Sequence, residues 1–196
     1  MLENIFKLHY KRFLLDKVAK CFAKYFTPNQ ITLISLITGI GVLPALLWHQ
    51  NGLAIFLLIF SGFLDTIDGE VARLQSLSSD IGSMLDIISD RIVEASVIIG
   101  LFLVNPSDRG LVSLCMMASI LICIASFLVV GIFTQNNSYK RFHYSPGLME
   151  RAEAFIFFIA MIMLPSFFSL IGILFCILVL LTAGLRIFQF IRSNST

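Results

Sequence analysis

The side chains best suited to chemistry are acidic, and they are crowded into one short segment of an otherwise apolar chain. Seven of the twelve Asp and Glu residues lie between positions 65 and 94. Residues three or four apart lie on one face of a helix, so Asp65 shares a face with Asp68, and Asp86 shares one with Asp90. Charged groups in a membrane are expensive and usually mark a cation or substrate site. We therefore expect the functional site in this segment.

Four carboxylates converging between two helix ends would repel one another and would lose their hydration. One divalent cation, or two, would relieve both effects. An oxygen-only ligand set without His or Cys favours Mg²⁺ or Mn²⁺ over Zn²⁺. Mg²⁺ bound by few carboxylates commonly also holds the phosphates of a substrate.

The residues around the carboxylates fit a phosphate-bearing ligand. Arg73 is a suitable partner for phosphate. Gly69 and Gly82 carry no side chain where a ligand must approach the backbone. Ala72 adds only a methyl group to the same helix face. Together they indicate phosphoryl transfer, in which metal ions stabilise a pyrophosphate leaving group while a carboxylate deprotonates the attacking hydroxyl.

Two other interpretations of the acidic segment remain open. The aspartates could form intramembrane ion pairs, for example Asp86 or Asp90 with Arg91, although they outnumber the nearby cations. They could instead line a path for a divalent cation or a proton, because acidic residues in spans also mark transporters. Such a path should place acids at several depths, yet three of the six predicted spans carry none.

Composition places the chain in a membrane. Of its 196 residues, 58% are apolar and 13% are charged, whereas soluble domains carry roughly 25% charge. The net charge of +2, without a basic patch interleaved with aromatics, argues against nucleic-acid binding. The four cysteines form no CxxC pair, which is typical of packing residues.

Six apolar segments separated by polar or proline-containing breaks predict six transmembrane helices. A preceding amphipathic helix over residues 1–26 would present one apolar stripe beside several lysines, which suits a helix lying in the membrane interface. The stripe consists of Leu14, Val18, Phe22 and Phe26. The alternative is a surface helix packed on the protein's own bundle. The predicted fold is an all-α integral membrane protein, a single domain over 1–196 with its bundle over 28–191. The predicted spans are 28–49, 52–76, 81–104, 109–135, 146–164 and 166–191.

The distribution of Lys and Arg predicts the orientation. A cytoplasmic N-terminus puts Arg73, Lys140, Arg141 and Arg192 on the same side, and leaves essentially Arg109 on the other. We therefore expect both termini, and the acidic segment, at the cytoplasmic face of a multi-pass protein of the cell's inner membrane.

The full pattern of the segment resembles the signature of the CDP-alcohol phosphotransferases, the class I CDP-alcohol phosphatidyltransferases. It reads Asp65-xx-Asp68-Gly69-xx-Ala72-Arg73-x8-Gly82-xxx-Asp86-xxx-Asp90. The resemblance implies a six-helix membrane fold, a homodimer and a cavity facing the cytoplasm. It also implies transfer of a phosphoalcohol from a CDP-alcohol to a hydroxyl, with release of CMP.

By this resemblance the four aspartates would ligate two divalent ions, and Asp90 would also act as general base on the acceptor. The start of the first span is similar to a nucleotide-contacting segment of the bacterial phosphatidylinositol-phosphate synthases, although Pro28 and Asn29 could simply cap the helix after Thr27. The expected donor-binding residues are Pro28, Asn29, Gln30, Ile31, Gly69, Ala72, Arg73, Ser79 and Gly82.

Four basic residues are candidates for binding the acceptor. Arg151, in a Glu-Arg-Ala-Glu run that resembles the inositol-phosphate-lipid branch, could bind a phosphate or pair with Glu150 or Glu153. Arg186 could reach the same cavity or extend to lipid headgroups. Lys140 and Arg141 could bind acceptor or serve only as topology signals.

We therefore expect a phospholipid-synthesis enzyme that uses Mg²⁺ or Mn²⁺. It would transfer a phosphatidyl group from CDP-diacylglycerol to a small polar alcohol such as inositol phosphate or glycerol phosphate. The alternative polarity transfers a phospho-headgroup from a CDP-linked polar alcohol to a lipid or polyol-phosphate acceptor. Outside enzymes, the alternative is a divalent-cation transporter.

Overall fold

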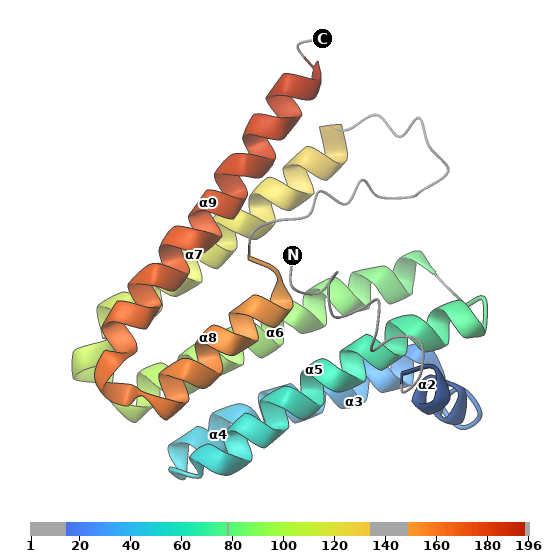
Figure 1. Cartoon of the computed structure of the whole chain (residues 1–196), viewed down its shortest axis with the longest axis horizontal. Helices are drawn as coiled ribbons and strands as arrows, with labels where there is room; N and C mark the ends of the chain where they lie inside the picture. The colour runs from blue at the N-terminus through green and yellow to red at the C-terminus, as the bar shows by residue number, and fades with distance from the viewer. Residues whose placement is uncertain (1–14, 78, 134–148, 195–196) are drawn as a thin grey trace. The chain divides into compact units, whose positions relative to one another are not determined.

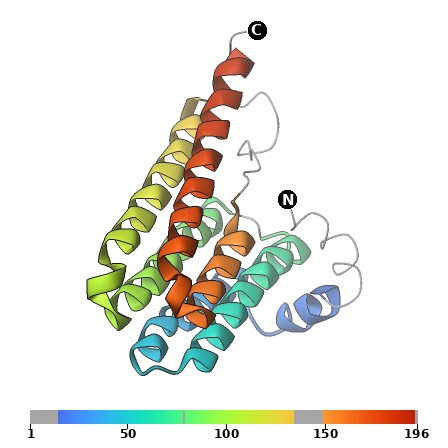
Figure 2. The same cartoon turned by 60° about the vertical axis from the view of Figure 1, so that its left-hand side comes forward.

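The structure, a computed structural model, describes residues 15–77, 79–133 and 149–194. These residues form helices and connecting turns, with no strand among them, so the predicted all-α class is confirmed there. The chain divides into two compact units, Leu2–Pro106 and Ser107–Thr196, and each is described by itself. Figures 1 and 2 show the helices from two directions.

The first unit contains five described helices, α2 (Asp16–Phe22), α3 (Pro28–Ile40), α4 (Val42–Leu47), α5 (Asn51–Leu74) and α6 (Asp80–Val104). The first predicted span is divided into α3 and α4 at Gly41, where Pro44 cannot donate a backbone hydrogen bond to the preceding turn. Both α5 and α6 pack mainly on α3 and α4, while their own backbones approach each other little. The helix α3 therefore provides a surface that α5 and α6 share.

Small and hydroxyl-bearing residues of α3 allow this helix to pack closely against α5 and α6. Ser35 Oγ donates to the carbonyl of Ser61 on α5 at 2.8 Å, and Ser61 Oγ donates back to the carbonyl of Ser35 at 2.9 Å. On the side facing α6, a Cβ added at Gly39 would come within 2.4 Å of Val93 Cγ2. Such close approach through small residues is typical of helices packed in membranes.

The N-terminal helix ends earlier than predicted. Residues 1–14 lie outside the described part, and α2 ends at Phe22, so Phe26 does not extend its stripe. Leu15 and Ala19 are buried against α3 and α5. The described part therefore matches a helix packed on the protein's own bundle, with Lys17 and Lys20 exposed; a position in the membrane interface stays a prediction.

The second unit contains three described α-helices and one 3-10 turn. They are α7 (Pro106–Phe133), α8 (Arg151–Met163), η2 (Pro165–Phe167) and α9 (Phe168–Asn194). Phe158 of α8 and Phe175 of α9 bury their rings against each other at 5.6 Å between centroids. Arg109 of α7 lies over the Phe168 ring at 4.8 Å, which gives this buried cation an aromatic contact.

Four of the six predicted spans have the length and hydropathy needed to cross a membrane, which makes the chain a multi-pass membrane protein. They are Pro28–Leu47, Asn51–Leu74, Pro106–Phe133 and Pro165–Arg192. The helix α6 is long enough at 25 residues but carries four acidic residues, Asp80, Asp86, Asp90 and Glu94. The helix α8 has only 13 residues, or about 20 Å, and is therefore shorter than the predicted fifth span.

Candidate functional site

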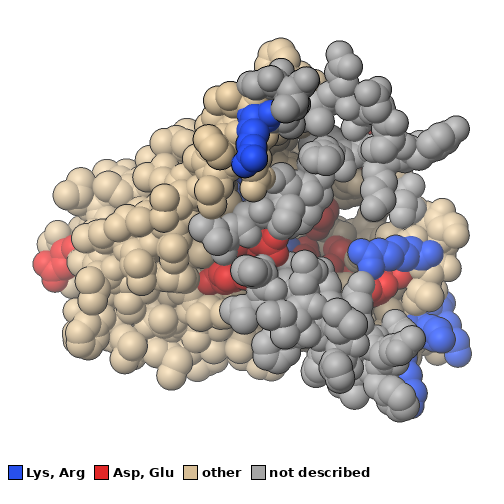
Figure 3. Space-filling view, turned by 45° about the horizontal axis from the view of Figure 1, so that its top comes forward, with Lys and Arg blue, Asp and Glu red and all other residues tan. Residues whose placement is uncertain are grey.

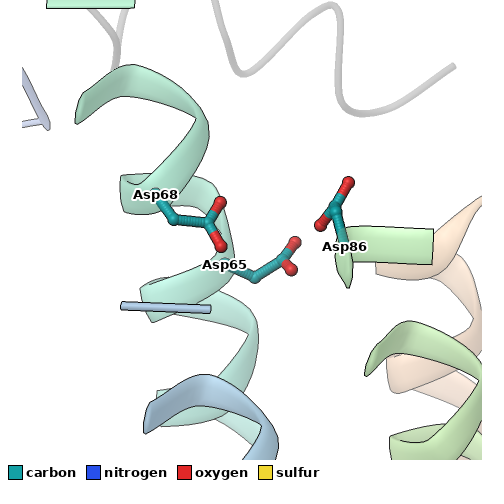
Figure 4. Close-up of side chains that lie close together, drawn as sticks. All are labelled: Asp65, Asp68 and Asp86. Atoms are coloured by element: carbon teal, nitrogen blue, oxygen red, sulfur yellow. The ribbon is translucent and has the colours of Figure 1, made fainter. Parts of the chain in front are cut away.

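Three of the four predicted carboxylates meet in the structure. Asp65 and Asp68 extend from α5 and Asp86 from α6, and each offers an oxygen atom within 4.8 Å of the other two. Figure 4 shows the carboxylates of Asp65 and Asp86 pointing toward one another, with Asp68 beside Asp65. In Figure 3, most of the visible Asp and Glu atoms lie in the middle and to the right of this face, partly beside Lys and Arg side chains. We call these three residues the acidic cluster.

The α5 carboxylates reach the cluster because α3 fixes the rotation of α5. Ser61, Leu64 and Asp68 are buried at i, i+3 and i+7 on the face of α5 that meets its neighbours. Asp65 is turned roughly 100° from Leu64 and roughly 60° from Asp68, so it lies at the edge of that face. Asp68 is only 6% exposed and accepts a 2.6 Å hydrogen bond from Thr32 Oγ1 of α3.

Asp90 does not belong to the acidic cluster. It lies one turn beyond Asp86 on α6, and its Oδ2 is 3.8 Å from Nη2 of Arg91. Arg91 makes a shorter pair, 2.7 Å, with the buried carboxylate of Glu94. The contact between Asp90 and Arg91 is one of the ion pairs that the sequence left open as an alternative.

The turn before α6 brings two predicted donor-binding residues together by helix capping. Ser79 is the N-cap of α6, and its Oγ accepts a 3.0 Å hydrogen bond from the backbone N–H of Gly82. A Cβ added at Gly82 would lie 3.2 Å from Ser79 Oγ and 3.4 Å from Asn29 Oδ1. The starts of α3 and α6 are therefore adjacent, although Ser79 already has a structural role there.

The start of α3 is also a capped helix terminus. Thr27 is the N-cap and Pro28 follows it in the first turn, so the segment has a capping role, while its contact with a nucleotide stays a prediction. Gln30 Oε1 accepts a hydrogen bond from the backbone N–H of Thr27 at 2.9 Å. Ile31 is fully buried in the apolar core and can offer a ligand only its backbone. Asn29 is exposed beside Gly82 and keeps its side chain available.

The glycine of the acidic segment faces open space. No atom of the described residues lies within 4 Å of a Cβ placed on Gly69. Packing therefore gives no reason for a glycine here, whereas the interior of a helix disfavours one. Ala72 is half-buried nearby, and Arg73 is an exposed side chain whose Nη1 lies 3.1 Å from Glu70 Oε1. Because the guanidinium side of this pair is exposed to solvent, Arg73 can exchange Glu70 for a phosphate.

The candidate acceptor residues lie outside the first unit. Lys140 and Arg141 are outside the described residues. Arg151, the first residue of α8, places its guanidinium over the Phe155 ring at 5.2 Å. Arg186 of α9 donates through Nη1 to the carbonyl of Cys123 at 3.1 Å and lies 3.3 Å from Ser126 Oγ, so it joins α9 to α7.

The acidic cluster fits a hard divalent cation. Its donors are carboxylate oxygens from two helices, one of them held in place by a hydroxyl, as cations such as Mg²⁺ and Mn²⁺ require. Oxygen atoms within 4.8 Å of one another can share one ion. A site for a second ion, with Asp90, stays a prediction.

Sequence reasoning missed the partners that orient the charged groups. Thr32 holds Asp68 from 36 positions away, which no local spacing reveals. Its only signal is the sequence of small or hydroxyl residues Thr32, Ser35 and Gly39, three and four apart in an apolar helix. Glu70 and Glu94 could have been found as acids three residues from arginines on the same helix.

Comparisons with known proteins agree with this geometry. The sequence model of the family described as CDP-alcohol phosphatidyltransferase matches residues 25–187. The chain is 29% identical over 172 residues to the inner membrane protein YnjF of Escherichia coli, covering 83% of this chain and 82% of that protein. It is 32% identical over 148 residues to the phosphatidylinositol phosphate synthase of Corynebacterium glutamicum, covering 73% and 66%.

A solved structure shows the same fold. The Mycobacterium tuberculosis phosphatidylinositol phosphate synthase, crystallised with CDP-DAG bound, superposes with a TM-score of 0.67 at 19% identity. The match covers 90% of this chain and 93% of that protein.

Proposed function

The chain belongs to the CDP-alcohol phosphatidyltransferase family, and on that premise we propose that it transfers a phosphatidyl group from CDP-diacylglycerol to the hydroxyl of a small polar alcohol, releasing CMP. Family membership makes it a membrane transferase of phospholipid synthesis, which removes the cation transporter as an alternative. The observation that carries the proposal is the acidic cluster, three carboxylates within 4.8 Å on two helices, beside the open space at Gly69.

Asp65, Asp68 and Asp86 would hold a divalent cation, Mg²⁺ or Mn²⁺, and Asp90 would complete a two-ion site. When bound, such ions neutralise the pyrophosphate of the donor and stabilise the charge that develops on the leaving phosphate. The absence of side chains at Gly69 and Gly82 lets that pyrophosphate come close to the backbones of α5 and α6.

The chain's own groups would do the rest of the chemistry. Asp90 accepts the proton of the acceptor hydroxyl, whose oxygen then forms a bond to the β-phosphorus, the one attached to diacylglycerol. The bond from that phosphorus to the bridging oxygen breaks, and CMP departs with its phosphate. Arg73 exchanges Glu70 for this phosphate, for which a planar guanidinium is well suited.

The donor-binding surface would extend from the α5–α6 turn to the first turn of α3. Asn29, Ser79 and Gly82 lie close together there and would contact the cytidine nucleotide, with Pro28, Gln30, Ile31 and Ala72 shaping the surface around them. CDP-diacylglycerol as donor is supported by the ligand of the mycobacterial structural neighbour and by the product named for the corynebacterial relative.

The acceptor would be an alcohol that carries a phosphate, such as inositol phosphate or glycerol phosphate. Arg151 and Arg186 of the second unit, with Lys140 and Arg141, are the cations assigned to it. We further assign six spans in a single domain, cytoplasmic termini, an active site open to the cytoplasm, and a homodimer. Exposed Lys17, Lys20 and Arg73 support this orientation by the excess of positive charge on the cytoplasmic side.

The test is CMP release by the purified protein in detergent. CDP-diacylglycerol is offered with inositol phosphate, glycerol 3-phosphate, inositol, serine or no acceptor, with Mg²⁺, Mn²⁺ or EDTA. We expect CMP only with metal and with one of the acceptors, and a lipid product containing that acceptor. Asp86→Asn should abolish release, while Asp108→Asn, an exposed aspartate at the start of α7, should not change it.

A different outcome would overturn the proposal. If CMP is released only from a CDP-linked polar alcohol in the presence of a lipid or polyol-phosphate acceptor, the polarity is the reverse of the one proposed. If neither class of donor gives CMP, the assigned chemistry is wrong.

A further inference from the structure

The hydrogen bond between Thr32 and Asp68 stands out among the contacts of the acidic cluster. Thr32 Oγ1 lies 2.6 Å from Asp68 Oδ2 and 3.1 Å from the carbonyl oxygen of Pro28. A threonine hydroxyl in a helix ordinarily donates to the carbonyl four residues earlier. Here the shorter distance is to the carboxylate and matches an O–H group donating to a charged oxygen. The proton is therefore directed at Asp68.

This hydrogen bond holds the orientation of the Asp68 side chain, because both of its partners are buried. Asp68 and Thr32 are each 6% exposed, so water has little access to replace the hydroxyl. About one turn farther along α3, Ser35 exchanges hydrogen bonds with Ser61 of α5 at 2.8 and 2.9 Å. The Ser35–Ser61 pair holds α5 to α3 without contacting a carboxylate, whereas the Thr32 hydroxyl sets the direction of one carboxylate.

We propose that Thr32 is a positioning residue for metal binding, which holds the Asp68 carboxylate in the orientation that Asp65 and Asp86 require for sharing a cation. This inference rests on the proposed function, because it assigns a metal to the acidic cluster. Carboxylate ligands of metals are generally oriented by hydrogen bonds from outside the metal's own shell, and loss of such a partner weakens affinity by about 10- to 100-fold.

The position of Thr32 also links the metal to the donor-binding surface. Its hydroxyl lies within 3.1 Å of the carbonyl of Pro28, in the first turn of α3. That turn carries Asn29, which lies beside Gly82 at the start of α6. One side chain thus touches both the helix start assigned to the nucleotide and the carboxylate assigned to the ion, so its loss should weaken the two together.

The experiment measures Mn²⁺ binding to the full-length protein by electron paramagnetic resonance, without substrate. Thr32→Val removes the hydroxyl but keeps the shape of the side chain, and we expect the Mn²⁺ dissociation constant to rise about 10- to 100-fold. Thr32→Ser keeps the hydroxyl and should remain within about threefold of wild type. Ser35→Ala is the matched control: it loses a hydrogen bond between the same helices, so the melting temperature should fall while Mn²⁺ affinity stays unchanged.

The outcomes separate the inference from the function on which it rests. Unchanged Mn²⁺ affinity in Thr32→Val, or equal weakening in Ser35→Ala, would overturn the positioning role even if wild type releases CMP. Failure of folded wild type to bind Mn²⁺ at all would instead overturn the metal site of the proposed function. Should valine prevent folding, Thr32→Ala makes the same measurement with less steric demand, and an unchanged affinity there would equally refute the inference.

Discussion

Replacing Gly69 with alanine should make the protein more stable and a worse enzyme. No atom of the described residues lies within 4 Å of the added methyl group, so the folded chain admits it without a clash. Alanine is favoured over glycine in a helix interior by about 1 kcal/mol. For a chain of this size, that free energy corresponds to a rise of roughly 2–4 °C in melting temperature.

The effect on activity should have the opposite sign. If the donor pyrophosphate lies against the backbone at Gly69, the methyl group must intrude into a packed contact, which costs about 1–3 kcal/mol. That cost corresponds to a loss of roughly 5- to 150-fold in kcat/KM for the CDP-alcohol. The measurement is CMP release against donor concentration, with melting of the same preparation in detergent.

Gly184→Ala supplies the control. Gly184 is also inside a helix, α9, and no described atom lies within 4 Å of its added Cβ. It should show the same rise in melting temperature with unchanged kinetics. Wild-type kinetics in Gly69→Ala would show that the space beside Gly69 is not where the donor binds, and a lowered melting temperature would show that this space is not open.

Three other substitutions test the site and the packing that supports it. Asp86→Asn removes one of the three carboxylates of the cluster, so Mn²⁺ affinity and CMP release should each fall by more than the about 10- to 100-fold typical of losing a ligand's hydrogen-bond partner, with Asp108→Asn unchanged. Gly39→Ala would place a methyl group 2.4 Å from Val93 Cγ2 and should destabilise the fold by about 1–3 kcal/mol, as followed by melting. Val93→Ala should recover most of that loss in the double variant, and an additive double variant would refute the contact. Ser76, at φ 56° after α5, has the left-handed backbone that favours glycine, so Ser76→Gly should raise the melting temperature by a few degrees; a fall would contradict this reading of the turn.

The sequence predicted the elements of the fold better than their lateral arrangement. Apolar runs and polar breaks located the helices from Pro28 onward, because membrane helices must be long and apolar and their ends polar. The same rule placed the end of the fifth span within one residue, but it placed the start at residue 146, whereas α8 begins at Arg151 after its N-cap Glu150. The short connection between α5 and α6 also did not reveal that α3 packs against both helices.

The candidate site was predictable in so far as it depends on spacing along one helix. Asp65 and Asp68 share a face of α5 by their separation alone, and Asp86 joins them as expected. Asp90 lies one turn farther along α6, outside the acidic cluster, and its contact with Arg91 depends on side-chain orientations that spacing does not fix. The role of Thr32 depends on a contact between residues 36 positions apart, which only the packed structure reveals.

The charged helix α6 has a consequence for how the chain is made. At the centre of a membrane-inserting helix, each charged residue is unfavourable by about 2.5–3.5 kcal/mol, and this helix carries Asp86, Asp90, Arg91 and Glu94 away from its ends. In the folded protein α6 packs against α3 and α4. These two helices are synthesised before it. We therefore expect α6 to enter the bilayer only after α3 and α4 have inserted and can pack against it. A truncated chain that starts at residue 79 should leave this segment in the aqueous phase.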